Sequence, residues 1–171
     1  PAGGGYQPAG AQAKTVFVFA GNGGNWAGMV RGLMQEPVFA ATLQDCDRIL
    51  SELGYPQPLL SVLESAQVTD VALGQPALCA FQLALVDLFG AWGVKPAAVI
   101  GHSVGEAAAA VTSGALTRRD GLRLVLERSR LQASVAGQGG MALVSAPADA
   151  VSRHLPTDVT IAGENGPRAT L

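Results

Sequence analysis

Charged residues are scarce in this chain: only 14% of its 171 residues are Asp, Glu, Lys or Arg, whereas 49% are hydrophobic. The formal net charge of −2 provides no attraction for nucleic acid or for an anionic membrane surface, so neither is expected as a partner. A chain with this much apolar side-chain area can bury a large core and is not expected to be disordered. Its length corresponds to about one domain.

Long apolar runs are also missing, because charged residues, glycine or proline interrupt each run before it could span a bilayer. No secretory signal pattern is present, and we expect no transmembrane helix and a cytoplasmic location. The two cysteines, Cys46 and Cys79, have no CxxC or other metal-binding spacing. We expect them to be small buried hydrophobic residues in a reducing compartment, and we expect no metal site.

The motif that organises the chain is a predicted strand, tight turn and helix around residue 103. An apolar run at 97–100 leads into Gly-His-Ser-Val-Gly at 101–105, and a helix-forming run follows at 106–111. This order of elements is the context of the G-x-S-x-G nucleophile elbow, in which glycines leave room for a tight turn. Ser103 would lie at the helix N-terminus, where the Val104 N–H can stabilise an oxyanion. The alternative is a structural turn whose serine has no chemical role.

Composition and periodicity divide the chain into three parts. Residues 1–14, mainly Pro, Gly and Ala without periodicity, are expected to be an interdomain linker of a longer polypeptide. Residues 15–136 are expected to form an α/β core, and 137–171 the beginning of a smaller lobe. In the core we expect a buried parallel strand at 15–19, a helix through Met29 and Leu33, and helices at 37–53, 76–92 and 117–136. In the lobe we expect strands at 141–146 and 159–162, a helix at 147–155 and a turn at 165–166.

A glycine-rich loop at 20–26 follows the first predicted strand. It lacks the Gly-Lys-Ser/Thr of a phosphate-binding P-loop, and Trp26 stands where a dinucleotide fingerprint has its third glycine. Its backbone N–H groups can nevertheless approach a ligand closely. The loop could therefore provide a second oxyanion donor beside Val104.

Arg128 and the two histidines are the remaining candidates for chemistry. Arg128 falls in an apolar-rich helix, where a guanidinium needs an anionic partner such as a carboxylate; the alternative is a solvated arginine. A serine nucleophile also needs a base. His102 adjoins Ser103 in a tight turn and should point away from the serine oxygen, while His154 lies in the small lobe.

Five segments resemble, in the same order, those of malonyl-CoA:acyl-carrier-protein transacylases, in the style of the acyltransferase domains of modular polyketide synthases. Residues 17–29 (F-V-F-A-G-N-G-G-N-W-A-G-M) are similar to the family's G-Q-G-S-Q-W-x-G-M segment, and 69–78 to its T-x-x-x-Q-P-A-L stretch. Residues 101–106 match G-H-S-x-G-E, 128–130 match R-S-R and 165–167 match N-G-P. The resemblance implies the N-terminal part of an α/β-hydrolase-like parallel-sheet core, followed by the start of a ferredoxin-like subdomain.

The resemblance also implies a function. A malonyl-type extender unit would move from malonyl- or methylmalonyl-CoA to the phosphopantetheine arm of an acyl carrier protein, next to a ketosynthase domain and without a tightly bound cofactor. The implied roles are nucleophile for Ser103, backbone oxyanion donors for Asn22 and Val104, and substrate binding for Gln75, His102 and Arg128, with Arg128 on the free carboxylate.

The chain departs from the family at 22 and 25, where Asn replaces Gln, a change to which a backbone N–H donor is indifferent. Val104 after the serine is similar to the malonyl-selecting members. The family takes its catalytic histidine from beyond Leu171, so we expect the isolated 171 residues to be inactive or very slow. A serine hydrolase or thioesterase with its own downstream Asp and His, or a non-catalytic fragment, are the alternatives.

Overall fold

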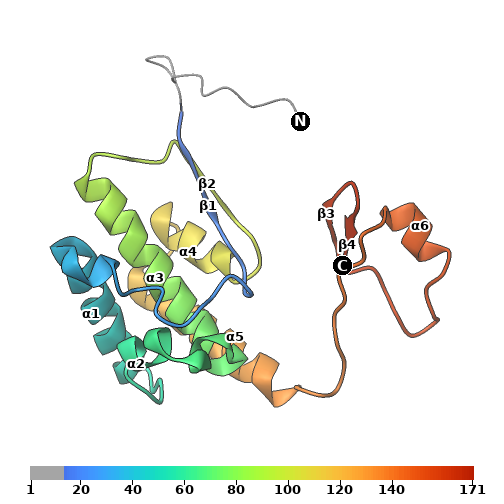
Figure 1. Cartoon of the computed structure of the whole chain (residues 1–171), viewed down its shortest axis with the longest axis horizontal. Helices are drawn as coiled ribbons and strands as arrows, with labels where there is room; N and C mark the ends of the chain where they lie inside the picture. The colour runs from blue at the N-terminus through green and yellow to red at the C-terminus, as the bar shows by residue number, and fades with distance from the viewer. Residues whose placement is uncertain (1–13) are drawn as a thin grey trace. The chain divides into compact units, whose positions relative to one another are not determined.

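The computed structural model describes residues 14–171, which form two compact units, one ending at Ser134 and the other spanning Val135–Leu171 (Figure 1). The boundary expected from the sequence follows residue 136, and the expected linker lies outside the described residues except for Lys14. The first unit combines helices with a parallel pair of strands, which confirms the predicted α/β class.

The two strands of the first unit bring its two loops together. β1 (Val16–Phe19) and β2 (Ala98–Gly101) pair in parallel, with Phe19 opposite Gly101. Beyond the last pair, the His102 N–H donates to the Phe19 carbonyl at 3.0 Å. Because parallel strands end at the same edge, the glycine-rich loop after β1 lies beside the serine turn after β2.

The first strand, predicted to be buried, is buried on one face only within residues 14–171. Phe19 is buried and Phe17 packs against Phe89 of the long central helix, but Val18 is 71% and Ile100 59% exposed. Side chains alternate across a strand, and within residues 14–171 helices cover one face of the pair. The apolar residues of the other face are therefore open to solvent in the described part of the chain.

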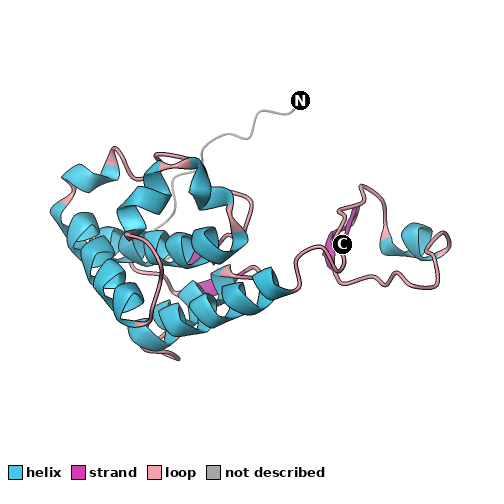
Figure 2. Cartoon of the chain, turned by 90° about the horizontal axis from the view of Figure 1, so that it is seen from below, coloured by secondary structure: helices cyan, strands magenta, loops and turns pink. Residues whose placement is uncertain are grey.

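Helices make up most of the first unit (Figure 2). α1 (Pro37–Glu52), α2 (Leu59–Glu64), α4 (Gly105–Thr112) and α5 (Arg118–Ser134) all contact α3 (Val71–Ala91). By length and mean hydropathy (1.5) α3 could cross a membrane, but 61% of its apolar 18-residue stretch is buried, as in a core helix. α3 is therefore the central helix of the first unit.

Two helix boundaries differ from the prediction for local reasons. α3 begins at Val71 rather than 76, because the Asp70 carboxylate accepts a hydrogen bond from the Leu73 N–H at 2.9 Å and caps the helix. Pro76 consequently lies inside α3. The helix expected through Met29 is replaced by turns and a 3₁₀ helix, η1 (Leu33–Gln35), since Gly28 has a φ of +82° that no right-handed helix accepts. A second 3₁₀ helix, η2 (Ala66–Thr69), precedes α3.

The second unit contains α6 (Ala148–Ser152) and a short antiparallel pair, β3 (Glu164–Gly166) and β4 (Ala169–Thr170). The strands predicted at 141–146 and 159–162 do not form, apart from one bridge between Val144 and Thr170. An isolated two-stranded sheet is only marginally stable, and β3 and β4 form such a sheet in the described second unit. The predicted turn at 165–166 is also wrong, because these residues belong to β3 and the chain turns at 167–168.

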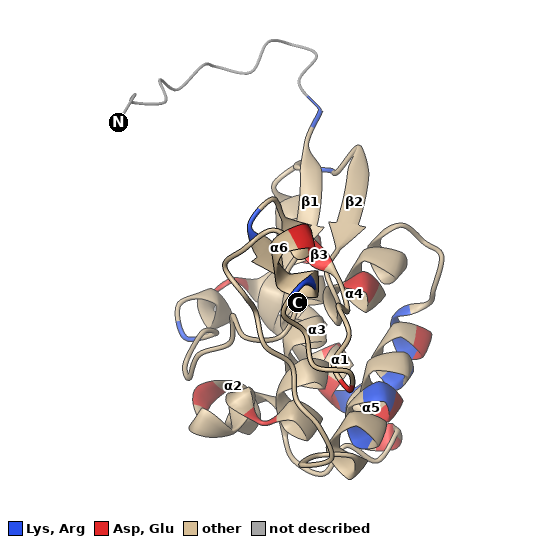
Figure 3. Cartoon of the chain, turned by 90° about the vertical axis from the view of Figure 1, so that its right-hand side faces the viewer, with Lys and Arg blue, Asp and Glu red and all other residues tan. Residues whose placement is uncertain are grey.

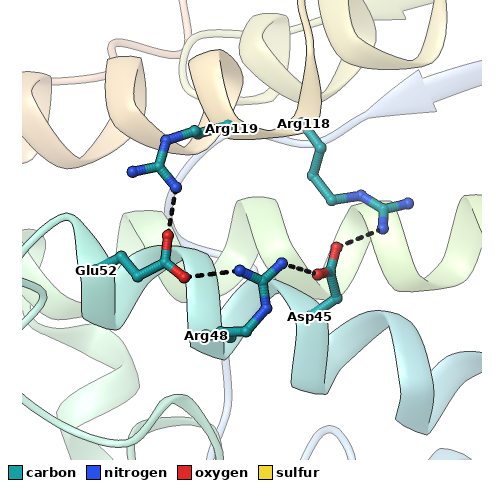
Figure 4. Close-up of polar contacts among 5 residues, drawn as sticks. All are labelled: Asp45, Arg48, Glu52, Arg118 and Arg119. Atoms are coloured by element: carbon teal, nitrogen blue, oxygen red, sulfur yellow. Dashed lines mark hydrogen bonds and ion pairs between the residues drawn. The ribbon is translucent and has the colours of Figure 1, made fainter.

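Several charged residues lie along α5 (Figure 3), and two of them form ion pairs with α1. Arg118 donates to Asp45 at 3.0 Å and Arg119 to Glu52 at 2.5 Å, while Arg48 bridges both carboxylates within α1 (Figure 4). Hydrogen bonds from Arg48 and then Arg118 lower the pKa of Asp45, and those from Arg119 and then Arg48 lower the pKa of Glu52. The network thus fixes the start of α5, the helix that carries Arg128.

Arg118 also donates to Asp87 of α3 at 2.6 Å, so it ties three helices together. We expect Arg118→Ala to lower the free energy of unfolding at pH 7 by about 1 kcal/mol, the upper end for a partly exposed pair. The folded-state pKa of Asp45 lies below its ordinary 3.8, so this contribution is present above that value and is lost as the pH falls through the folded pKa.

Urea unfolding at pH 7 and pH 3 measures this effect, with Arg123→Ala as the matched control. Arg123 is exposed on α5 and makes no ion pair within residues 14–171. The network would have no role in stability if both variants unfolded at the same urea concentration at pH 7.

Candidate active site

Ser103 occupies a strained turn between β2 and α4. Its φ of +53° is the only positive value of a non-glycine residue in the described chain. This conformation is unfavourable for a side chain and is typically retained at functional sites, where it projects the side chain from the turn. The predicted strand, turn and helix are therefore present, with the serine side chain exposed.

The glycines of the turn are required by the close approach of neighbouring backbone. A Cβ on Gly105 would lie 2.3 Å from the Phe19 carbonyl oxygen, and one on Gly101 would lie 2.4 Å from the Glu106 Cα. Neither separation is compatible with a side chain, so glycine is needed at both positions. The steric reason inferred from the sequence is confirmed.

The two predicted oxyanion donors lie on adjoining backbone segments. Val104 follows the serine as the N-cap of α4, and its N–H makes no hydrogen bond within residues 14–171. Asn22 belongs to the loop after β1 and is exposed. Its neighbour Gly21 is so close to the serine turn that a Cβ there would lie 3.3 Å from the Ser103 Cβ. The free Val104 N–H at this helix end suits a developing negative charge.

Arg128 reaches from α5 to the serine. Its Nη2 donates to Ser103 Oγ at 3.3 Å, and its Nη1 donates to Gln75 Oε1 of α3. The structure therefore brings together three of the residues selected from the sequence, although they lie on three different elements. The anionic partner expected for Arg128 is not found within residues 14–171, where Arg128 is exposed and makes no ion pair.

Gln132 completes the cluster and was missed by the sequence reasoning. Its Oε1 accepts hydrogen bonds from Gln75 Nε2 at 2.8 Å and from Arg128 Nη1 at 3.4 Å. The available signal was spacing, because residues four apart lie on the same face of a helix and Gln132 follows Arg128 by four.

Neither histidine is paired with the serine in the described chain. His102 makes no hydrogen bond to Ser103, and its Nδ1 faces the loop after β1, where a Cβ on Gly21 would lie 2.7 Å away. His154 is exposed just after α6 in the second unit. The base for Ser103 is therefore not found within residues 14–171.

The cysteines and other metal-binding side chains take no part in this site. Cys46 and Cys79 are fully buried and free, and burial raises the pKa of each thiol to about 12. They are the small buried hydrophobic residues that the sequence predicted. Within residues 14–171, no cluster of three His, Cys, Asp or Glu side chains could hold a metal ion.

Comparison with known proteins yields matches over nearly all of the described chain. The sequence profile of the acyl transferase domain matches residues 16–171. Erythronolide synthase EryA3 of Saccharopolyspora erythraea is 40% identical over 162 residues, which cover 91% of this chain and 5% of that protein.

Solved structures give the same result. The acyltransferase domain from module 8 of the salinomycin polyketide synthase has a TM-score of 0.84 and 38% identity, over 92% of this chain and 39% of its own. The acyltransferase domain of SpnD, in complex with 2-(pent-4-yn-1-yl)malonyl, has a TM-score of 0.84 and 32% identity, over 97% of this chain and 40% of its own. The chain thus spans less than half the length of these relatives.

The close contact between Gly105 and Phe19 predicts that a larger residue at 105 destabilises the fold. We expect Gly105→Ala to lower the free energy of unfolding by about 3 kcal/mol, because the new Cβ would force the serine turn away from β1. Gly32→Ala is the matched control: Gly32 has a φ of −71° and open space around it, so alanine should be neutral or stabilise by about 0.4–1 kcal/mol. Equal urea midpoints for the two variants would contradict the expected steric conflict.

Proposed function

Because this chain belongs to the acyl transferase domain family, we propose that it supplies the nucleophile and the acyl-binding arginine of an acyltransferase. The reaction moves a malonyl-type group from coenzyme A to the phosphopantetheine arm of an acyl carrier protein during polyketide synthesis. The observation that carries the proposal is the 3.3 Å hydrogen bond from Arg128 Nη2 to Ser103 Oγ. Arg128 has no acidic partner in the described chain.

The chemistry follows from these groups. Ser103 Oγ attacks the thioester carbonyl, and the N–H groups of Val104 and Asn22 stabilise the tetrahedral oxyanion until the coenzyme A thiolate leaves. The pantetheine thiol of the carrier protein then attacks the acyl-serine by the same route in reverse. A histidine from outside residues 14–171 takes the serine proton in this proposal, since neither His102 nor His154 is hydrogen-bonded to Ser103.

In this proposal, Arg128 favours an acyl group with a free carboxylate. Its guanidinium is held by neutral acceptors, the Gln75 amide and the Ser103 hydroxyl, so its positive charge is not compensated within residues 14–171. A carboxylate on the acyl group would form a charge-assisted, bidentate pair with it beside the attacked carbonyl. The malonyl group named for the SpnD domain belongs to this class of ligand. Gln75 and His102 would border the same acyl site.

The surroundings of the domain complete the proposal. Polyketide synthases such as the relatives of this chain are large, and the chain covers 5% of EryA3. We place it in the cytoplasm as part of such a synthase, next to a ketosynthase domain, with residues 137–171 beginning a ferredoxin-like subdomain.

We expect Ser103→Ala to abolish formation of the acyl-enzyme in the full-length protein, because no other group would carry the acyl chain. Incubation with radiolabelled malonyl-CoA and intact-mass analysis measure it, with Ser113→Ala, at the exposed end of α4, as the control. Label retained until carrier protein is added indicates a transferase, whereas immediate loss to water indicates a hydrolase. Normal labelling of the Ser103→Ala protein would falsify the nucleophile assignment.

We expect Arg128→Ala to lower kcat/KM for malonyl-CoA by about 10- to 100-fold, the value of a charge-assisted hydrogen-bond pair at an exposed site. Acetyl-CoA has no free carboxylate and should lose little, so the malonyl-to-acetyl ratio falls. Arg128→Lys should restore little, because an ammonium cannot form the planar fork.

Arg123→Ala, exposed on the same helix, is the control for a general loss of positive charge. A malonyl-to-acetyl ratio that is the same in wild type and in Arg128→Ala would show that Arg128 is structural.

A further inference from the structure

Gln132 has no role in the function proposed above, yet it makes two contacts to the residues that hold the acyl site. It lies one helical turn after Arg128 on α5 and accepts from both Gln75 Nε2 and Arg128 Nη1. Gln75 is 1% exposed, so water cannot replace the amide partners of its side chain. The orientation of the buried amide therefore depends on its protein neighbours.

The donors and acceptors of the cluster can be satisfied in one arrangement. An arginine has donors but no acceptor, so Gln75 must present its oxygen to Arg128 Nη1. Its Nε2 then needs an acceptor on the opposite side, and Gln132 Oε1 occupies that position at 2.8 Å. Without this acceptor, a buried N–H would lose its partner, and the Gln75 amide would be free to rotate away from the guanidinium.

The same arrangement fixes the direction of Arg128. Its Nη1 is engaged by the two glutamine oxygens, which leaves Nη2 on the side of Ser103 Oγ. We propose that Gln132 is a positioning residue that, together with Gln75, holds the Arg128 guanidinium toward Ser103 and thereby sets the preference for acyl groups with a free carboxylate. This inference rests on the proposed acyltransferase function.

The neutrality of Gln132 is as important as its oxygen. The nearest acidic residue on α5, Glu127, is paired with Arg130 at 3.0 Å, so it does not compensate Arg128. A carboxylate at 132 would keep an acceptor for Gln75 but would form an ion pair with Arg128, four residues earlier. The substrate would then have to compete with a permanent anion.

Two substitutions test separately whether Gln132 acts through its acceptor oxygen or through its lack of charge. Gln132→Met keeps the length and helix preference of the side chain but removes the acceptor. Gln132→Glu keeps the acceptor but adds a negative charge. In the full-length protein we expect the ratio of kcat/KM for malonyl-CoA over acetyl-CoA to fall about fivefold in the first variant, the effect of about one hydrogen bond. In the second variant we expect this ratio to fall about tenfold or more. In both variants the change should come mainly from a higher KM for malonyl-CoA.

Gln44→Met is the matched control, since Gln44 is exposed on α1 and makes no side-chain hydrogen bond within residues 14–171. A structural role for Gln132 would lower the rates with both substrates equally, together with the melting temperature, and would overturn the inference. If the wild type forms malonyl-Ser103 but both Gln132 variants keep its malonyl-to-acetyl ratio of kcat/KM, the role of Gln132 alone is overturned. A wild type that forms no malonyl-Ser103 would overturn the proposed function and this inference together.

Discussion

The close approach of the serine turn to the end of β1 is the constraint on which the site depends. The Phe19 carbonyl accepts a hydrogen bond from His102 and leaves no space for a Cβ on Gly105. This contact continues the pairing of β2 with β1 up to Ser103, the residue with the positive φ, and to the first residue of α4. The strain at the serine is stabilised by strand pairing and helix packing around it, which is how a fold can retain an unfavourable backbone conformation.

The other half of the site depends on helix packing. Arg128 and Gln132 lie on α5, and Gln75 lies on α3, so their contacts require these two helices to keep a fixed separation. The buried residues of α3 and α5 provide part of this restraint. The ion pairs of Arg118 with Asp45 and Asp87 add direction, because they fix the first turn of α5 on both α1 and α3. Hydrophobic burial therefore determines how close the helices lie, and the charged network determines how α5 is placed along them.

Much of this arrangement could be predicted from residues that act locally. The serine turn follows from two glycines between an apolar strand and a helix, and α1 follows from the spacing of Phe39, Leu43 and Cys46. What failed depended on distant partners or on competing local signals. The strands expected in the second unit had suitable residues but no adequate neighbour, and the Asp70 cap prevailed over Pro76 as the start of α3. The spacing of four places Gln132 on the helix face of Arg128, but its contact with Gln75 joins α5 to α3 and could not be read from that spacing.

Two arginines of the same helix illustrate how structure and function use the same group differently. Arg118 forms ion pairs with Asp45 of α1 and Asp87 of α3, so its charge is compensated and links these helices to α5. Arg128 contacts only neutral oxygens within residues 14–171, so its geometry is fixed while its charge remains uncompensated. In the function proposed above, an acidic neighbour of Arg128 would occupy the position of the acyl carboxylate. The two glutamines around Arg128 thus hold the cation in place without neutralising it, as the proposed acyl site beside Ser103 requires.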